Sequence, residues 1–459
     1  MSKAPLLRPD LLNQDIATTL KSMTLPMIVG MIMLMTFGLV DTFFISMLGT
    51  DELAAISFTF PVTFTVISLN IGLGIGTSAV IARLLGANLH EQAKETATGA
   101  LMLAFVLAIV LAVIGVLSLE PIFKAMGASD ALMVHIKDYM YVWYAAGVFL
   151  AMPMVGNSVL RAAGDTKTPS YIMAFGGLVN VILDPLLIFG WGPFPALGIK
   201  GAAIATLIAW AIGLFYIIYL LALKRQLMQP RLLNWLELKR SCGGILKIGL
   251  PAAGANMLTP IATGFVTSIV ATYGSVAVAA WGVGGRLESI ASIVVLSLSM
   301  SLPPFISQNL GANKLDRVLQ AFVLCIKFVI AWQLMIYVLV AIGAGFIASI
   351  FTDDPQVASI IQLFLLIVPL GYGLQGVIIL TNSSFNAMHL PMSALALSIL
   401  RLFIVFVPFA YIGSYLYALH GLFIAAVLAN LLVAIVAFMW FRSVLRKQVT
   451  LVNLAEKVS

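Results

Sequence analysis

A few acidic side chains stand inside long apolar stretches of this sequence, where a carboxylate is costly. A charged residue at the centre of a membrane helix costs about 3 kcal/mol on insertion scales, and such residues commonly mark ion or substrate paths. Of the 18 Asp and Glu residues, three lie well inside apolar stretches: Asp41, Asp184 and Glu288. Each is therefore a candidate for binding a proton or a small cation.

The stretch "VNVILDP" at 179–185 carries the densest of these signals. Asn180 precedes Asp184 by one helical turn, so both side chains lie on one face of the same helix. Pro185 cannot donate a backbone hydrogen bond, which predicts a kink that frees a carbonyl near Val181. A carboxylate, an amide oxygen and a free carbonyl predict a site for a proton or a small hard cation such as Na⁺. The alternative is a structural polar pair in a kinked helix.

Two further side chains complete the predicted site. Asp41 lies near the outer half of the first apolar stretch, and Thr206 lies at a similar depth in the sixth. Asp41 could instead be a helix-end aspartate at the interface, and the Thr206 hydroxyl could bond back to its own helix. Val266 occupies the position that corresponds to Asp41 in the second half of the chain. We therefore expect cation coupling in the first half.

The second half offers Arg286 and Glu288, two positions apart in the eighth apolar stretch. We expect these charges to neutralise each other or their neighbours, which is a structural role. The sequence leaves a functional role for them open.

The elements that carry these residues are membrane-spanning helices. The chain has 459 residues, of which 61% are hydrophobic and only 9% charged. A helix needs about 20 apolar residues to cross the hydrocarbon core, and we identify twelve such stretches between residues 17 and 442. The apolar runs do not alternate in polarity, which excludes a β-barrel. The predicted fold is an all-α integral membrane protein. Its two cysteines and four scattered histidines have no metal-ligand spacing, so we expect no metal cofactor.

The basic residues predict the orientation in the membrane. Most of the 25 Lys and Arg residues fall in the two termini, which include Lys3, Arg8 and Lys457, and in every second loop. The opposite loops contain only Lys124, Lys137 and Lys200. By the positive-inside rule both termini face the cytoplasm, across a bacterial cytoplasmic membrane. The net charge of +7 reflects this bias rather than binding of nucleic acid.

The chain also repeats itself. "LPMIVGMIM" at 25–33, "LGANLHE" at 85–91 and "NSVLRA" at 157–162 have counterparts at a constant offset, at 250–258, 310–316 and 382–387. "KGAAIA" at 200–205 has its counterpart at 420–425, after a shorter loop. This repeat predicts two six-helix lobes, related by a pseudo-two-fold axis along the membrane normal, with a central cleft between them. We predict lobes at 1–223 and 248–447, a cytoplasmic linker at 224–247 and a cytoplasmic tail at 448–459.

Several motifs together resemble the multidrug and toxic compound extrusion (MATE) family. They are "LPMIVGMIMLMTFGLVDTFFISMLGTDELAAIS", "GLGIGTSAVIARLLGAN", "NSVLRAAGDTKTP" and "NVILDPLLIFG". The resemblance covers nearly the whole chain and implies export of cationic or amphipathic drugs by antiport against H⁺ or Na⁺. An acidic first helix with Asn-x-x-x-Asp in the fifth resembles the DinF-type branch, whose coupling carboxylates lie in the N-terminal lobe. The resemblance assigns Asp41, Asn180, Asp184 and Thr206 to the cation site, with Tyr139 as a neighbour.

The expected function is secondary active multidrug efflux by a monomer, with H⁺ favoured over Na⁺ and no cofactor. Two close carboxylates in a low dielectric tend to share a proton, and the first helix can bend at Pro26. A flippase for lipids or lipid-linked oligosaccharides is the alternative. It would need several cations in the spans, and these contain only Arg286, Lys327 and Arg401. A membrane-embedded enzyme would need a nucleophile and base or a metal cluster, which the spans lack.

Overall fold

The computed structural model describes residues 10–229 and 231–458, with side chains described up to residue 450, and in this part of the chain every regular element is a helix. The first half contains α1 (Ile16–Ser46), α2 (Thr50–Gly86), α3 (His90–Ala125), α4 (Asp130–Ala145), α5 (Gly147–Ala162), α6 (Lys167–Phe189), α7 (Ile199–Tyr219) and the π-helical turn η1 (Leu220–Lys224). The predicted basic residues Lys3 and Arg8, and the side chain of Lys457, lie outside the described residues.

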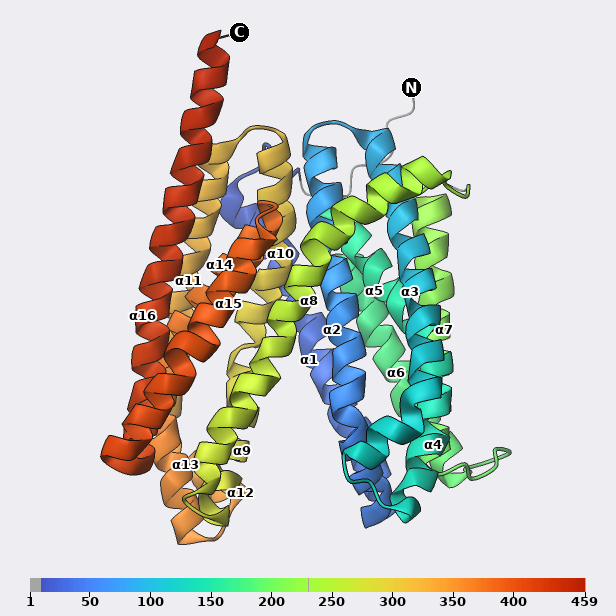
Figure 1. Ribbon diagram of the computed structural model, residues 1–459, viewed down its shortest axis with the longest axis vertical. Coiled ribbons are helices and arrows are strands. Elements are labelled where there is room, and N and C mark those ends of the chain that lie inside the picture. Colours follow the sequence, from blue (N-terminus) through green and yellow to red (C-terminus); the bar gives the residue numbers. More distant parts are fainter. Residues whose placement is uncertain (1–9, 230, 459) are drawn as a thin grey trace. The chain divides into compact units, whose positions relative to one another are not determined.

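The second half is also helical throughout and is divided into more elements (Figure 1). It contains α8 (Trp235–Ala271), α9 (Ser275–Ala291), α10 (Ile293–Gly311), α11 (Leu315–Ile342), α12 (Ala344–Phe351), α13 (Pro355–Ile367), η2 (Val368–Gly371), α14 (Tyr372–Ala387), α15 (Pro391–Ile399), the π-helical turn η3 (Leu400–Phe406) and α16 (Val407–Val458). The tail predicted at 448–459 continues α16 as helix up to Val458.

The twelve predicted spans all correspond to helices. Within the described residues, ten helical segments are individually long and apolar enough to cross a membrane, and α4 with α5 forms an eleventh that is bent by 47°. The segment 391–450 provides two spans rather than one, because α16 is broken by non-helical backbone at Tyr417 and Ala418. Large apolar side chains such as Leu117 and Ile342 remain exposed on the helix surfaces, as expected where lipid replaces water. The chain is a multi-pass membrane protein.

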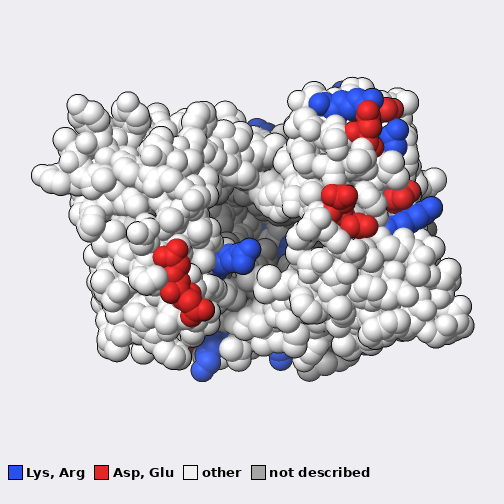
Figure 2. Space-filling view, turned by 90° about the horizontal axis from the view of Figure 1, so that it is seen from below, with Lys and Arg blue, Asp and Glu red and all other residues white. Residues whose placement is uncertain are grey.

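The charged residues are sparse at the end of the molecule shown in Figure 2. Small groups of basic and acidic side chains stand there in a surface of uncharged residues. Two of the three lysines predicted for the outer side, Lys124 and Lys137, lie 3.5 and 3.4 Å from the carboxylate of Glu120. Their charges are therefore partly balanced, although the orientation in the membrane stays a prediction.

The helices divide into two compact units. Unit 1 contains residues 25–253 and unit 2 contains residues 10–24 and 254–459. In unit 1, α5 lies against α2, α3 and α7, with Val155, Val159 and Leu160 fully buried. In unit 2, the rings of Phe322 and Phe441 stack at 4.0 Å between centroids.

The unit boundaries differ from the predicted lobes, because α1 and α8 each contribute to both units. The start of α8 packs in unit 1, where a Cβ placed on Gly72 would lie 2.7 Å from the Ala253 Cβ. The segment before Leu25 packs in unit 2, where Asn309 Nδ2 donates to the Leu11 carbonyl at 3.0 Å. The linker predicted at 224–247 is helical from Trp235 onwards. Its basic residues mark the end of the apolar region and not the end of the helix.

The backbone reproduces the sequence repeat. Asn88 and Asn313, which occupy equivalent places in the two "LGAN" motifs, both adopt left-handed conformations with φ of 59° and 57°. Gly198 has φ 56° and ψ −137° directly before α7, and Ala418 has φ 51° and ψ −137° at the equivalent position of the second half. The second half therefore forces alanine into a conformation that glycine adopts in the first.

Candidate cation site

The structure brings the two carboxyl groups of the first half together. Asp41 comes from the C-terminal part of α1 and Asp184 from the last turns of α6, and their carboxyl groups lie within hydrogen-bonding reach of each other. Asp184 has no exposed surface. The Oδ1 atoms of both residues are buried without a hydrogen-bond partner among the described residues. Two acidic groups thus share one secluded space with unused oxygen atoms.

Asn180 joins Asp184 to α7. In the amide orientation that satisfies both ends of the side chain, the nitrogen donates to Asp184 Oδ2 at 3.1 Å. The Asn180 oxygen then accepts from the backbone N–H of Thr206 at 3.3 Å and from its hydroxyl at 3.1 Å. The expected one-face arrangement of Asn180 and Asp184 is therefore present, and the Thr206 hydroxyl reaches across to α6.

Tyr139 is the fifth member of this cluster. It lies on α4, partly buried, and both Asp41 and Asp184 are close enough for their charges to act on its hydroxyl. All five residues predicted for the site therefore belong to one cluster inside unit 1.

Close helix packing sets this arrangement. A Cβ placed on Gly177 of α6 would overlap the ring of Phe37 on α1, so only glycine allows this approach. The N-terminus of α6 is held by Asp165, whose carboxylate accepts from the Thr168 N–H at 3.0 Å and pairs with Arg225 at 2.6 Å. These contacts hold the N-terminus of the helix whose last turns carry Asp184.

The two prolines predicted to bend helices lie inside continuous elements. α1 includes Pro26 and α6 includes Pro185, and neither helix is interrupted there. The expected disruption of the helix near Val181 is therefore limited to one missing backbone hydrogen bond, because Pro185 has no N–H to donate to that carbonyl. Only four residues of α6 follow Pro185, so little helix remains to be redirected.

The cluster has acidic oxygens and, in the part of the chain that the structure describes, no positively charged partner. Among the described residues, no ion pair within 4.0 Å joins Lys, Arg or His to Asp41 or Asp184. No group of three or more His, Cys, Asp and Glu side chains that could hold a metal ion occurs in that part of the chain either. Two carboxylates cannot both stay charged in such a place without compensation. The arrangement can therefore take up H⁺, or Na⁺ with the amide and hydroxyl oxygens as further ligands.

The second unit has a different polar cluster, which the sequence indicated only in part. Glu288 on α9 accepts a hydrogen bond from Gln375 Nε2 at 2.9 Å. Of the two expected forms of neutralisation, the one between Arg286 and Glu288 is absent, because Arg286 is exposed and forms no ion pair with a described residue. Arg401 on η3 and Tyr372 on α14 instead lie within electrostatic range of Glu288. Gln375 and Tyr372 gave no signal in the sequence, since both are unremarkable in an apolar helix.

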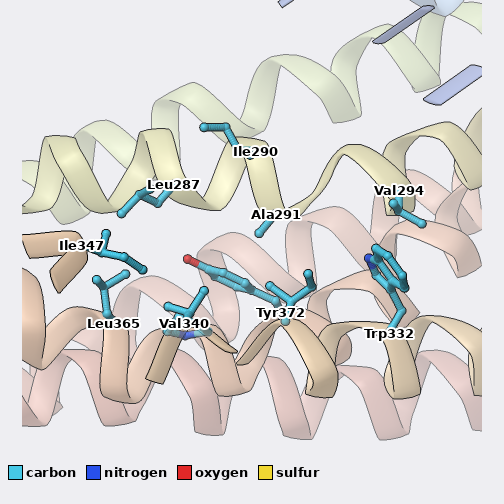
Figure 3. A pocket seen from close by; sticks show the side chains of 11 residues that line it. Leu287, Ile290, Ala291, Val294, Trp332, Val340, Ile347, Leu365 and Tyr372 are labelled. Atoms are coloured by element: carbon cyan, nitrogen blue, oxygen red, sulfur yellow. The ribbon is translucent and has the colours of Figure 1, made fainter. Parts of the chain in front are cut away.

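A pocket of about 260 Å³ opens in the same unit (Figure 3). The side chain of Tyr372 points into it. The rest of its walls are formed by largely apolar residues: Leu287, Ile290, Ala291, Val294, Trp332, Ile336, Val340, Ile347, Leu365 and Pro369. The Tyr372 hydroxyl is buried and has no hydrogen-bond partner among the described residues.

Comparison with known proteins relates both halves of the chain to one family. The family model described as MatE matches residues 26–186 and again residues 251–412. The FAD transporter of Shewanella oneidensis is 42% identical over 431 residues, which cover 94% of this chain and 95% of that protein. The probable multidrug resistance protein YoeA of Bacillus subtilis is 29% identical, with 80% of each chain covered. The multidrug export protein MepA of Staphylococcus haemolyticus is 26% identical, with 90% of each covered.

Solved structures agree with these relatives. The MATE transporter VcmN of Vibrio cholerae, in its bent form, superposes with a TM-score of 0.90 at 35% identity and covers 94% of this chain and 97% of that one. A transporter of the MOP superfamily from Pyrococcus furiosus superposes with a TM-score of 0.88 at 27% identity, covering 97% and 99%.

Proposed function

We propose a cation antiporter, on the premise that this chain belongs to the MatE family and is therefore a transporter and not an enzyme. The observation that carries the proposal is the pair Asp41 and Asp184, two acidic groups in reach of each other without a positive partner among the described residues. Such a pair binds a cation or proton in exchange for another ligand. Its place in the N-terminal half supports a transporter of the DinF type.

The mechanism follows from the charge of this pair. With the site open to the outside, Asp41 and Asp184 take up a cation, for which H⁺ is our choice over Na⁺. Uptake removes charge and changes the hydrogen bonds that join Asp184, Asn180 and Thr206. That change favours a state with lower affinity for the substrate, which leaves outward, and the loaded protein then releases the cation into the cytoplasm. Each ligand must bind one state better than the other for coupling to occur.

Cationic or amphipathic drugs are one candidate substrate class. Two relatives named for multidrug resistance or export, with 29% and 26% identity, support this class. Flavin adenine dinucleotide (FAD) is the second candidate substrate, and the 42% identity with a protein named FAD transporter favours it. The protein would act in the cytoplasmic membrane with both termini inside, as a monomer, and would need no cofactor.

The test uses the purified full chain in liposomes loaded with either a cationic dye or FAD. Release is followed under a pH gradient alone and under a sodium gradient alone. Release driven by the pH gradient supports proton antiport, and the loaded compound that is released identifies the substrate class. Release that ignores both gradients would contradict antiport and favour a flippase.

A further inference from the structure

The pocket of Figure 3 lies where the helices of unit 2 are interrupted. α9 is separated from α10 at Ser292, α11 is separated from α12 at Gly343, and the turn η2 separates α13 from α14. Wall residues stand on both sides of each interruption: Ala291 and Val294, Val340 and Ile347, and Leu365 and Tyr372. The pocket is therefore the space that these interrupted helices leave between them.

Two of these interruptions distinguish the second half of the chain from the first. At the constant offset of the repeat, residues 275–311, which α9 and α10 divide, correspond to α2. Residues 315–350, which α11 and α12 divide, correspond to α3. Both α2 and α3, which the structure describes in full, are continuous helices. Tyr372 corresponds to Gly147, which has no side chain. The repeat alone therefore accounts neither for the pocket nor for its hydroxyl group.

The hydroxyl group of Tyr372 is available to a ligand in this pocket. Tyr372 is only 4% exposed, and its side chain points into the pocket (Figure 3). Its hydroxyl is buried and has no hydrogen-bond partner among the described residues. A buried hydroxyl without a partner is unfavourable, so a molecule in the pocket that accepts a hydrogen bond from it would be favoured over a purely apolar one.

Gln333 on α11 fixes the surroundings of the pocket. Its Nε2 donates to the carbonyl of Ala291 at 2.9 Å, which joins the end of α9 to α11. A Cβ placed on Gly373 would lie 3.5 Å from the Gln333 Cβ, so the start of α14 packs against the same residue. These contacts join three helices next to the pocket, as expected for a pre-formed binding site.

We propose that this pocket binds a small lipid-soluble aromatic compound that carries one hydrogen-bond acceptor, such as an aryl ketone. The volume of about 260 Å³ falls just below the roughly 300–1,000 Å³ of pockets for drug-sized ligands, which favours a smaller molecule. The largely apolar walls favour a lipid-soluble body, and the rings of Trp332 and Tyr372 favour an aromatic one. The phenolic O–H of Tyr372 donates to the acceptor.

The site is separate from the coupling pair of unit 1. Asp41 and Asp184 belong to unit 1, whereas every residue that lines the pocket belongs to unit 2. Ile290, one of the wall residues, is 61% exposed, so the wall reaches the surface of unit 2. The inference therefore depends neither on the exported substrate nor on the coupling ion.

The experiment measures binding of para-fluoroacetophenone to the purified full chain in detergent by fluorine NMR. The matched compound is para-fluoro-α-methylstyrene, which has the same shape but a methylene group in place of the ketone oxygen. We expect Tyr372→Phe to weaken binding of the ketone about 2- to 10-fold, the value of one neutral hydrogen bond, and to leave the alkene unchanged. Val340→Phe fills the pocket and should abolish binding of both. Tyr415→Phe, which changes a tyrosine of α16 that is 84% exposed, is the matched control and should change neither.

The two compounds and the variants separate the possible outcomes. Equal affinity of wild type and Tyr372→Phe for the ketone would overturn the role of the hydroxyl. Binding of both compounds that survives in Val340→Phe would place them outside this pocket. Wild-type binding no greater than partition into empty micelles would overturn the site altogether. If Val340→Phe does not fold, the comparison of ketone and alkene in Tyr372→Phe still decides the question, because that variant loses only an oxygen atom.

Discussion

Asp41 and Asp184 lie 143 positions apart in the sequence, yet their carboxyl groups are within hydrogen-bonding reach inside unit 1. The pair has no positively charged partner among the described residues. In the antiport that we propose, this pair is the coupling site.

Removing either acid should uncouple transport without unfolding the protein. We expect Asp41→Asn and Asp184→Asn each to abolish gradient-driven efflux, because the amide can neither take up nor release a proton. The variants should keep the wild-type unfolding temperature in detergent. Asp51→Asn, at an exposed position at the start of α2, is the matched control and should export normally. Full gradient-driven export by Asp41→Asn would rule out this role.

The amide bridge should be needed for efficient coupling. Asn180→Ala removes the donor to Asp184 and the acceptor for Thr206, which leaves buried groups unsatisfied at about 1–3 kcal/mol. We expect the rate of coupled efflux to fall about 10-fold or more. Thr206→Val removes only the hydroxyl and leaves the backbone N–H contact, so its loss should be smaller. The idea fails if Thr206→Val is the more damaging change in liposome efflux assays.

The approach of α1 to α6 should control the site from a distance. A Cβ on Gly177 overlaps Phe37, so Gly177→Ala should push the two helices apart and separate Asp41 from Asp184. We expect reduced efflux in Gly177→Ala and partial recovery in the double variant with Phe37→Ala. Gly176→Ala is the matched control, since nothing lies within 4 Å of its added carbon. Similar losses in Gly176→Ala and Gly177→Ala would refute this explanation.

The strained backbone of Ala418 predicts a simple stabilisation. Its φ of 51° with ψ of −137° suits glycine, which stands at the equivalent Gly198. Relief of such strain is worth about 1–3 kcal/mol, so Ala418→Gly should raise the unfolding temperature in detergent. Gly198→Ala should lower it. A lower unfolding temperature for Ala418→Gly would show that the position carries no strain.

The sequence predicted those features that depend on spacing along one helix. Asn180 and Asp184 share a face because they are one turn apart, and the spans followed from apolar length. The contact between Asp41 and Asp184 depends on how α1 meets α6, which in turn depends on Gly177 and Phe37. No periodicity within one helix records such a contact.

The second half of the chain also has contacts between helices that spacing along one helix does not predict. Arg286 and Glu288 are close in sequence but point to different surroundings, since two positions span more than half a helical turn. Glu288 instead meets Gln375, 87 positions away. The division of α1 and α8 between two units was also beyond the sequence, because the repeat identifies equivalent helices but not the unit against which each end packs.

The most direct test drives the exchange with a gradient of the substrate instead of a gradient of the ion. Full-length protein in liposomes with an internal pH dye and equal pH on both sides receives only an outward gradient of its substrate. We predict that substrate leaving the liposomes drives protons inwards, that the lumen acidifies for the wild type, and that this signal disappears in Asp184→Asn. A substrate flux of normal size with no movement of H⁺ or Na⁺ in the wild type would contradict cation coupling at Asp41 and Asp184.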